Sequence, residues 1–525
     1  MGELLPRLKA LAAQARRHNI DLNIDVEESD RLDLSLDLLE ALCHMPELAR
    51  WNGIGFVVQA YGKRASHVVD YLIELARQTK HRLMVRLVKG AYWDTEIKRT
   101  QVEGVDDFPV FTRKCHTDVS YLACACRLLA AKEEIYPQLA TPCRIYAPVG
   151  AHRALLCYLV RRLLENGANS SFVNQAANPE ISLDELIRDP VSLARKVSPL
   201  GAPHADIRPP EKIFGPSRRN SHGLDLTDEC MLETLDKSLR EIERAYDSRP
   251  LIAHFDASGD ATRHVINPAD HRDIVGQVTY ASDAAMEKAL ENADQEETWR
   301  NMTPAARRDI LDKCADALET HMIELIALLV REVGKTYANA VGEVREAVDF
   351  LRYYGAQVAM KDSEATITPL GIILCISPWN FPLAIFTGQI AASLAAGNAV
   401  IAKPAEETPL IAAIAVRLFH ESGVPVPALQ LLPGDSDVGA ALVADKRIDG
   451  VMFTGSTKVG KLISGVLLGR RGRTGQSVSF IAETGGQNAV LVDSSSLPEQ
   501  AVTDIIASAF DSAGQRCSAL RVLLV

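Results

Sequence analysis

The chain has 525 residues, which is too long for one ordinary hydrophobic core and predicts two to four domains. Its 57 basic and 68 acidic residues give a net charge of −11, which argues against binding nucleic acid through a broad basic surface. No apolar run approaches the roughly 18 to 20 residues of a membrane span, and the start of the sequence lacks the apolar region of a signal peptide. Its ten scattered cysteines indicate neither a disulfide framework nor a metal site, so we expect a metal-free protein of the reducing cytosol.

The first 140 residues alternate between patterns of strand and helix. We expect helices at 4–17, 29–43, 65–78 and 111–131, separated by strands at 22–26, 54–59, 83–89 and 135–140. This spacing indicates parallel β/α construction. Polar side chains stand where these strands end, at Asp25, Gln59, Arg86 and Lys89, followed by Tyr92 and Trp93. One such residue is most simply a loop residue in solvent, but several strands ending alike favour a site at the carboxyl face of a barrel.

The regular alternation breaks after residue 140. A strand-like run at 143–148 follows without an intervening helix, although parallel neighbours need a crossover of a dozen or more residues. A helix at 152–166 carries Arg161 and Arg162, and a last strand is expected at 171–174. These elements amount to about six strands, whereas a closed barrel needs eight in roughly 250 residues. We therefore expect an incomplete barrel.

The second half of the chain is introduced by a proline-rich stretch at 199–216, which predicts a linker. A connecting helix is expected at 224–246, and hairpin-like strands at 264–268 and 276–278 follow it. Long helices at 284–293, 304–333 and 338–360 then lead into a second region where strands and helices alternate.

Three strand ends in this second region suit a cofactor and an oxyanion. A buried strand at 369–376 runs into two prolines that stiffen the loop around Asn380, whose carboxamide can donate to a developing oxyanion. The next strand ends at Lys403 with Glu406 three residues on, and an acidic group there suits ribose hydroxyls. Residues 450–460 indicate strand, glycine turn and helix start, with N–H groups aimed at a phosphate. Taken singly these motifs are weak, because the glycine spacing is unusual and a proline-rich turn is commonly a packing feature.

Glu483 and Cys517 are the candidate base and nucleophile. Glu483 follows an apolar run at 478–482, and Cys517 stands among small polar residues. A free cysteine is more often a packed thiol than a nucleophile. Its neighbours make a poor core, however, and Arg516 favours the thiolate. A nucleophile paired with a general base is the resulting hypothesis.

Together these segments resemble the aldehyde dehydrogenase superfamily, since five motifs occur in its order, and the run 508–521 is similar to its pyrroline-5-carboxylate dehydrogenase branch. The resemblance implies that Cys517 attacks the aldehyde while Asn380 and the Cys517 N–H hold the oxyanion. It implies that NAD takes the hydride and that Glu483 activates the water that hydrolyses the thioester. The residues implied in NAD binding are Ser377, Trp379, Lys403, Glu406, Phe453, Gly455 and Ser456.

The first part of the chain resembles the flavin-dependent proline dehydrogenase barrel in the runs 23–28, 85–94 and 161–169. The resemblance implies that Arg161 and Arg162 clamp the proline carboxylate, which a guanidinium fork matches. Without it, an arginine pair on a helix would be a solvated face. The other residues implied at the proline site are Asp25, Leu87, Tyr92 and Tyr146, and those implied in FAD contacts are Gln59, Arg86, Lys89, Trp93 and Glu165.

The sequence also departs from both families. Proline dehydrogenases carry earlier barrel strands and a further segment between the equivalents of Thr141 and Pro142, and aldehyde dehydrogenases continue beyond the equivalent of Val525. We therefore expect an incomplete α/β chain. Its expected parts are a partial (β/α)8 barrel at 1–198, a linker and connecting helix at 199–250, a Rossmann-like NAD-binding domain at 251–482 and the start of a catalytic domain at 483–525.

The two resemblances together point to the bifunctional proline-utilisation family. The implied function is oxidation of proline to glutamate, with FAD in the first step, NAD in the second and a quinone as the flavin's electron acceptor. Two alternatives stay open: a partial NAD-binding fragment without turnover, and a DNA-binding repressor role in a longer protein, for which no basic segment is visible here. We expect a cytoplasmic protein, peripheral at most to the membrane, that forms homo-oligomers at full length.

Overall fold

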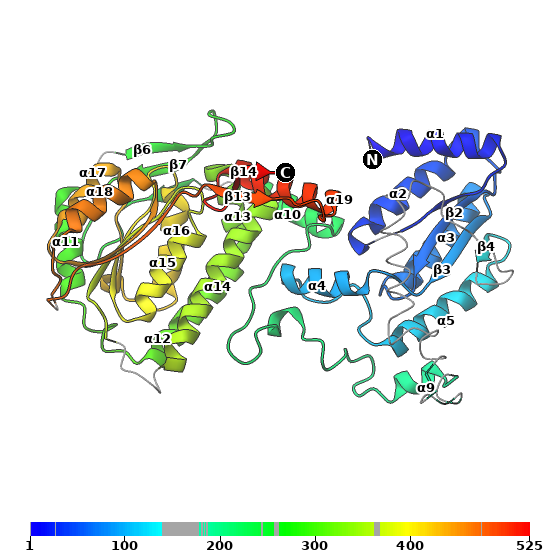
Figure 1. Cartoon of the computed structure of the whole chain (residues 1–525), viewed down its shortest axis with the longest axis horizontal. Coiled ribbons are helices and arrows are strands. Elements are labelled where there is room, and N and C mark those ends of the chain that lie inside the picture. The colour runs from blue at the N-terminus through cyan, green and yellow to red at the C-terminus, as the bar shows by residue number, and fades with distance from the viewer. Residues whose placement is uncertain are drawn as a thin grey trace. The chain divides into compact units, whose positions relative to one another are not determined.

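The computed structural model describes residues 2–26, 28–138, 178–179, 182, 184, 187–242, 245–256, 262–361, 368–473 and 475–525. These residues form two compact units, Met1–Pro210 and Glu211–Val525, which are taken separately below (Figure 1). The expected α/β class is confirmed, because both units are built on parallel sheets with helices between the strands. The elements expected at 143–148, 152–166 and 171–174 lie outside the described residues. Within the described ranges, no helix is long and apolar enough to span a membrane.

The first unit contains a parallel sheet whose strands pair in chain order: β1 (Leu22–Ile24), β2 (Ile54–Gln59), β3 (Leu83–Val88) and β4 (Ile135–Gln138). Its helices are α1 (Leu4–Arg17), α2 (Leu32–Cys43), α3 (Ala65–Thr79), α4 (Trp93–Glu103), α5 (Lys114–Ala130) and α9 (Pro190–Arg195), with short 3-10 turns η1 (Ser29–Arg31) and η2 (Pro46–Leu48). Alternate residues of β3 (Leu83, Val85 and Leu87) join the hydrophobic core beneath α3 and α5. The opposite face of β3 carries Arg86. Consecutive parallel strands with helical crossovers are how a β/α barrel is built.

Helix α4 was not expected from the sequence, because a buried carboxylate on the helix, and not an apolar face, holds it in place. Glu96 is 1% exposed, and its carboxylate accepts bonds of 2.6 Å from the N–H and the hydroxyl of Ser29. A helix fixed through a carboxylate lacks the apolar stripe by which helices are recognised in a sequence. The helix expected at 111–131 is shorter than predicted, because Arg113 is extended and α5 begins at Lys114.

The second unit is organised around a five-stranded parallel sheet with the order β10-β9-β8-β11-β12. Its strands are β8 (Ile372–Ile376), β9 (Ala399–Lys403), β10 (Leu429–Leu431), β11 (Ile448–Gly455) and β12 (Ser479–Thr484). One face is covered by α12 (Pro304–Thr320), α13 (Met322–Val333), α14 (Tyr337–Lys361), α15 (Ala384–Ala395) and α16 (Pro409–Glu421), and the other by α11 (Asp283–Asp294), α17 (Ser436–Ala444) and α18 (Thr457–Leu467) (Figure 1). Strands buried on both sides explain why they appear in the sequence as continuous apolar runs.

Smaller elements flank this sheet. Strands β6 (Thr262–Ile266) and β7 (Ile274–Thr279) are antiparallel, which confirms the expected hairpin, and β5 (Tyr246–Ser248) pairs with β7. The helix expected at 224–246 is shorter, because α10 (Glu229–Glu241) starts at its Asp228 cap and ends before β5. The chain finishes with β13 (Asn488–Leu491), α19 (Pro498–Phe510), the 3-10 turn η5 (Asp511–Gly514) and β14 (Leu520–Leu524), and two further 3-10 turns are η3 (Pro210–Lys212) and η4 (Val426–Ala428).

The single helix expected at 304–333 is two helices that meet at His321. This residue leaves helical geometry at φ −98° and ψ 16°, so it ends α12 and precedes α13. The hydroxyl of Thr320 donates to the Asp316 carbonyl, and the His321 ring contacts the Ala317 carbonyl. Side chains that bond back to the preceding turn compete with continuation of the helix. Apolar periodicity alone did not reveal this break.

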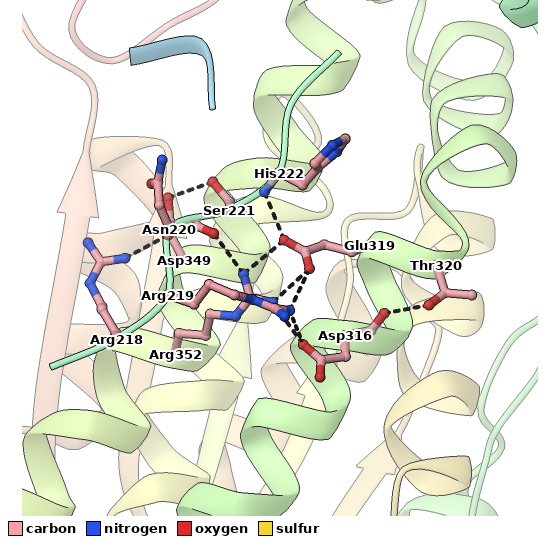
Figure 2. Close-up of polar contacts among 10 residues, drawn as sticks. All are labelled: Arg218, Arg219, Asn220, Ser221, His222, Asp316, Glu319, Thr320, Asp349 and Arg352. Atoms are coloured by element: carbon pink, nitrogen blue, oxygen red, sulfur yellow. Dashed lines mark hydrogen bonds and ion pairs between the residues drawn. The ribbon is translucent and has the colours of Figure 1, made fainter. Parts of the chain in front are cut away.

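A polar network holds residues 218–222 along α12 and α14 (Figure 2). Arg352 of α14 is only 3% exposed, and it pairs with Asp316 and Glu319 of α12 while donating to the Asn220 carbonyl. The other contacts of the network join Arg218 and Ser221 to Asp349, Arg219 to Asp316 and Glu319, and the His222 N–H to Glu319. Because these charges are shared among several partners, they fix the C-terminal half of α14 against α12.

Two helices of the second unit begin at buried carboxylates that come from other helices. Glu332 of α13 accepts from the N–H groups of Leu410 and Ile411, in the first turn of α16, at 2.7 and 3.0 Å. Glu343 of α14 accepts from the N–H of Ala384, the first residue of α15, at 2.8 Å. Unsatisfied N–H groups at a helix start favour an acceptor and a negative charge. Burial opposes that charge and raises the pKa of Glu332 to about 8.

We expect the variant Glu332→Gln to change the pH dependence of stability. The folded carboxyl, with its raised pKa, binds a proton more tightly than the unfolded one, so the wild-type protein loses stability as pH rises through the window from about 4.5 to about 8. The loss is at most about 1.4 kcal/mol per pH unit. Urea unfolding at pH 5, 6, 7 and 8 should therefore show that the free energy of unfolding of the wild type falls steadily relative to that of Glu332→Gln. The exposed first-turn carboxylate of α19, changed in Glu499→Gln, is the matched control, and a pH-independent difference for Glu332→Gln would refute the assignment.

Candidate active site

The candidate site lies at the carboxyl edge of the five-stranded sheet, where the strand order reverses. From β8 the chain proceeds to β9 on one side, and it later returns to place β11 on the other side of β8. Loops leaving two such neighbouring strands diverge and open a crevice, which is where open α/β sheets bind ligands. Ser377 follows β8 and Ser456 follows β11, so both stand at this reversal.

A cavity of about 820 Å³ occupies this crevice. Its volume falls within the roughly 300 to 1,000 Å³ of small-molecule and cofactor sites. All ten residues that the sequence predicted for catalysis and NAD binding line it: Ser377, Trp379, Asn380, Lys403, Glu406, Phe453, Gly455, Ser456, Glu483 and Cys517. They come from five segments spread over 141 positions of the chain. Folding therefore brings the predicted set together, while the role of each residue stays a prediction.

The segment before Cys517 has an unusual backbone. Ser512, Ala513 and Gly514 all have positive φ, at 53°, 54° and 67°. Two of the three are not glycine, and left-handed conformations of such residues cost free energy that functional sites commonly store. The side-chain amide of Asn488 donates to the Cys517 carbonyl at 2.7 Å. A tight turn on one side and this bond on the other hold the thiol at the cavity wall.

Asn380 bonds directly to this segment. Its Nδ2 donates to the Gln515 carbonyl at 2.8 Å, which ties the loop after β8 to the residue two positions before Cys517. A carboxamide carries two N–H groups, so one remains for an acceptor in the cavity. Glu483, the second-last residue of β12, pairs with Thr454 of β11 and lines the same cavity. The geometry thus offers a thiol, a carboxylate and an amide donor around one space.

Cys517 differs from several other cysteines of the described chain in how deeply its thiol is buried. Burial raises the pKa of the thiols of Cys43, Cys314 and Cys375 to about 12, because a thiolate is poorly solvated inside a core. Cys517 is exposed on the cavity wall. The thiolate is the nucleophilic form of cysteine, so these buried thiols are poor candidates for the nucleophile.

Another part of the cavity wall suits a dinucleotide. Helix α18 begins there, and its cap Ser456 accepts from the Val459 N–H, while the start of a helix favours a phosphate. Lys403 is buried beside Glu406, and burial lowers the pKa of its ammonium group, opposed by the charges of Glu406, Asp435 and Glu407. An acidic group and a lysine at a strand end match the polar edge of a ribose. The donors and acceptors present are those that NAD requires.

In the first unit, residues expected at the FAD and proline sites gather near the carboxyl ends of β2 and β3. Arg86 pairs with Asp25 at 2.7 Å, and the Gln59 side chain accepts from the Ala91 N–H at 3.2 Å. Within the described residues, the buried Nε of Arg86 has no hydrogen-bond partner. A donor left in this state fits a ligand that supplies an acceptor. Arg86 is thus suited to the flavin contact expected of it.

The remaining residues expected at that site are placed as follows. Lys89 pairs with Asp118, the ring N–H of Trp93 donates to the Phe111 carbonyl, and Tyr92 precedes α4. Leu87 is buried in the hydrophobic core, on the face of β3 opposite Arg86. Tyr146, Arg161, Arg162 and Glu165 lie outside the described residues.

The structure adds residues whose importance the sequence did not reveal. Asn488 follows Glu483 by five residues, and its bond to the Cys517 carbonyl was not predicted. Gly486 approaches the same carbonyl so closely that a Cβ there would lie 2.6 Å from its oxygen. Lys335 and Glu343 form a buried ion pair behind Asn380. A glycine or a lysine gives no signal of such contacts, because they depend on segments distant in sequence.

Two models of known protein families match the chain. The model of the "Aldehyde dehydrogenase family" matches residues 255–525, and the model "Proline dehydrogenase" matches residues 3–142 and 141–175. The second match divides where the sequence was expected to lack a segment.

Individual relatives extend the comparison over the whole chain. The "Bifunctional protein PutA" of Klebsiella aerogenes is 52% identical over 579 aligned positions, which cover 100% of this chain and 44% of the relative. The crystal structure of Bradyrhizobium japonicum PutA mutant D779Y superposes with a TM-score of 0.88 at 42% identity, covering 100% of this chain and 56% of that one. A Thermus 1-pyrroline-5-carboxylate dehydrogenase with bound NAD gives a TM-score of 0.55 at 34% identity, covering 58% and 62%. The chain thus spans about half the length of its PutA relatives.

The close approach of Gly486 to Cys517 generates a test. In Gly486→Ala the new methyl group would meet the Cys517 carbonyl, so we expect a loss of about 1 to 3 kcal/mol of stability and a displaced Cys517 segment. Thermal unfolding and the rate of Cys517 alkylation by iodoacetamide measure the two effects. Gly485→Ala is the matched control, since no atom of the described chain lies within 4 Å of a Cβ built there. Equal behaviour of the two variants would contradict the geometry.

Proposed function

Because the chain belongs to the aldehyde dehydrogenase family, we propose that its second unit oxidises an aldehyde to a carboxylate with NAD. The observation that carries the proposal is the single cavity lined by Cys517, Glu483, Asn380 and the start of α18. The proposed substrate is glutamate semialdehyde, the open form of pyrroline-5-carboxylate, and the product is glutamate. Similarity to PutA over the whole chain supports this choice of substrate.

The residues of the cavity divide the chemistry among them. The Cys517 thiolate adds to the aldehyde carbon, and the former carbonyl oxygen becomes an anion that Asn380 Nδ2 and the Cys517 N–H stabilise. When bound, NAD would supply the hydride acceptor, and loss of the hydride from that carbon would leave a thioester on Cys517. Glu483 takes a proton from water as the water oxygen attacks the thioester carbon. The C–S bond breaks and releases the thiolate and a carboxylic acid, which loses its proton to solvent. Such general base catalysis typically contributes about a hundred to ten thousand fold.

The cofactor would be held along the cavity wall that the start of α18 and the end of β9 form. The start of α18, with Gly455 and Ser456, suits the pyrophosphate. Lys403 and Glu406 suit the adenosine ribose. The segment Ser377 to Trp379 and the ring of Phe453 line the remaining walls, where they exclude water from the reacting groups.

We propose that the first unit derives from a proline dehydrogenase barrel that oxidises proline to pyrroline-5-carboxylate with FAD. The matched segments at 3–142 and 141–175 support this half, as does the orphaned Nε of Arg86. Covalent linkage of the two halves raises the local concentration of the intermediate at the second site. Retention of FAD by the purified chain, and bleaching of the flavin by proline, test this half independently of NAD.

The partners and location follow from that chemistry as further proposals. We propose that electrons from the flavin pass to a quinone. We also propose a cytoplasmic protein that is peripheral at the inner face of the membrane, where a quinone would be reached. The family similarity also supports a homo-oligomer at full length.

The direct test is NADH formation by the purified chain supplied with pyrroline-5-carboxylate and NAD. We expect Cys517→Ala to reduce the rate at least about a thousandfold, because the nucleophile is lost. Cys230→Ala, which removes another exposed cysteine of the same unit, should leave the rate unchanged. Retained turnover in Cys517→Ala would refute the mechanism. NAD binding by a folded wild-type chain without turnover would instead support the alternative of a partial, NAD-binding fragment.

A further inference from the structure

A buried ion pair lies behind the loop that carries Asn380. Lys335 Nζ is 2.9 Å from Glu343 Oε1, and their side chains are only 4% and 1% exposed. Lys335 follows Gly334, which ends α13 at φ 75°, and Glu343 lies in the second turn of α14. Burying two charges costs several kcal/mol per ion unless further interactions satisfy them. The other contacts of Lys335 and Glu343 therefore indicate the role of this ion pair.

The second oxygen of Glu343 caps the helix that follows the Asn380 loop. It accepts from the Ala384 N–H at 2.8 Å, and the residue at the cap position, Leu383, has no side chain that could do so. Helix α15 begins only four residues after Asn380, with Pro382 between them. Glu343 thus fixes the downstream end of the loop. Burial raises the pKa of its carboxyl, and the charge of Lys335 opposes that effect.

The ammonium group of Lys335 also contacts the loop itself. Its Nζ lies 4.4 Å from the centroid of the Phe381 ring, which is a cation–π distance. Phe381 is the residue directly after Asn380. The pair therefore contacts the loop at two points. Lys335 contacts Phe381, and Glu343 accepts from the N–H of Ala384. Both points are within four residues of the amide that faces the cavity.

The restraint continues from Asn380 to the nucleophile. Asn380 Nδ2 donates to the Gln515 carbonyl at 2.8 Å, two residues before Cys517. A second link runs from Asn339, in the first turn of α14, to Asp511 at 2.9 Å and from Asp511 to Arg516 at 2.6 Å. The start of α14 consequently supports both loops, and the network around Arg352 anchors the other end of the same helix (Figure 2).

We propose that Lys335 is a positioning residue for Asn380: through Phe381 and Glu343 it sets the position of the oxyanion-binding amide relative to Cys517. The inference rests on the role proposed above for Asn380. Lys335 does not line the cavity and takes no part in the chemistry. The competing explanation is that the pair only stabilises the fold, as the buried Glu332 does at the start of α16.

Hydrogen exchange of the chain distinguishes these explanations without requiring turnover. In Lys335→Met, which removes the charge and keeps most of the apolar stem of the side chain, we expect peptides covering 378–386 and 511–519 to exchange at least about threefold faster. Asn380→Ala should itself accelerate 511–519, and adding Lys335→Met to it should then leave 511–519 unchanged, because the connecting bond is already absent. Glu332→Gln is the matched control and should accelerate exchange only around residues 408–413.

Two results would overturn the proposal. One is that peptides 378–386 and 511–519 exchange in Lys335→Met at the same rate as in the wild type. The other is that Lys335→Met accelerates exchange of 511–519 in the Asn380→Ala background as much as it does when Asn380 is present. If Lys335→Met does not fold, Phe381→Leu removes the aromatic contact and leaves the ion pair in place. It should accelerate the same two peptides, and exchange at the wild-type rate would equally overturn the proposal.

Kinetic constants also distinguish the two explanations. A purely structural role of Lys335 would not lower kcat selectively while leaving the KM for NAD unchanged. In a chain that forms NADH, we expect Lys335→Met to lower kcat at least about tenfold, with the KM for NAD within about twofold of the wild type, since a misplaced group costs rate more than binding. The same substitution should have no effect in the Asn380→Ala background. A wild-type chain without NADH formation would count against the proposed function, while the exchange experiment would still decide the role of Lys335.

Discussion

The reversal of strand order between β8 and β11 is the constraint on which the candidate site depends. Helices cover both faces of the sheet, so the loops leaving these two neighbours are drawn apart and leave a crevice at the carboxyl edge. Side chains from loops after β8, β9, β11 and β12 meet there. The thiol of Cys517 comes from a later segment, and the bonds of Asn380 and Asn488 to that segment hold it at the same cavity.

Helix α14 contacts both the loop that carries Asn380 and the segment that carries Cys517. Its first two turns carry Asn339 and Glu343, which reach the Cys517 and Asn380 loops, and its later turns carry Asp349 and Arg352, which reach residues 218–222 and α12. Buried charges add little net stability, so their value here lies in fixing geometry. A helix anchored at one end can hold two loops at a set distance from each other, which a nucleophile and an oxyanion donor require.

Much of the site could be predicted from the sequence because of how the strands end. Apolar runs that meet proline or glycine reveal both a strand and its carboxyl end, which is why Ser377, Lys403 and Gly455 were placed correctly at the sheet edge. Contacts between distant segments were not predictable. A lysine after a helix is ordinarily solvated, so nothing in the sequence indicated that Lys335 is buried against Glu343. Helix α4 was missed for a related reason, since its anchor is the carboxylate of Glu96.

The central claim is that Cys517 forms a covalent intermediate that Glu483 resolves. The most direct measurement is peptide mass spectrometry of the variant Glu483→Gln after mixing with NAD and pyrroline-5-carboxylate. Because this variant lacks the base, we expect one equivalent of NADH and a glutamyl thioester that accumulates on the peptide containing Cys517. A variant that binds NAD but forms no adduct, or one that is modified at a different cysteine, would contradict it.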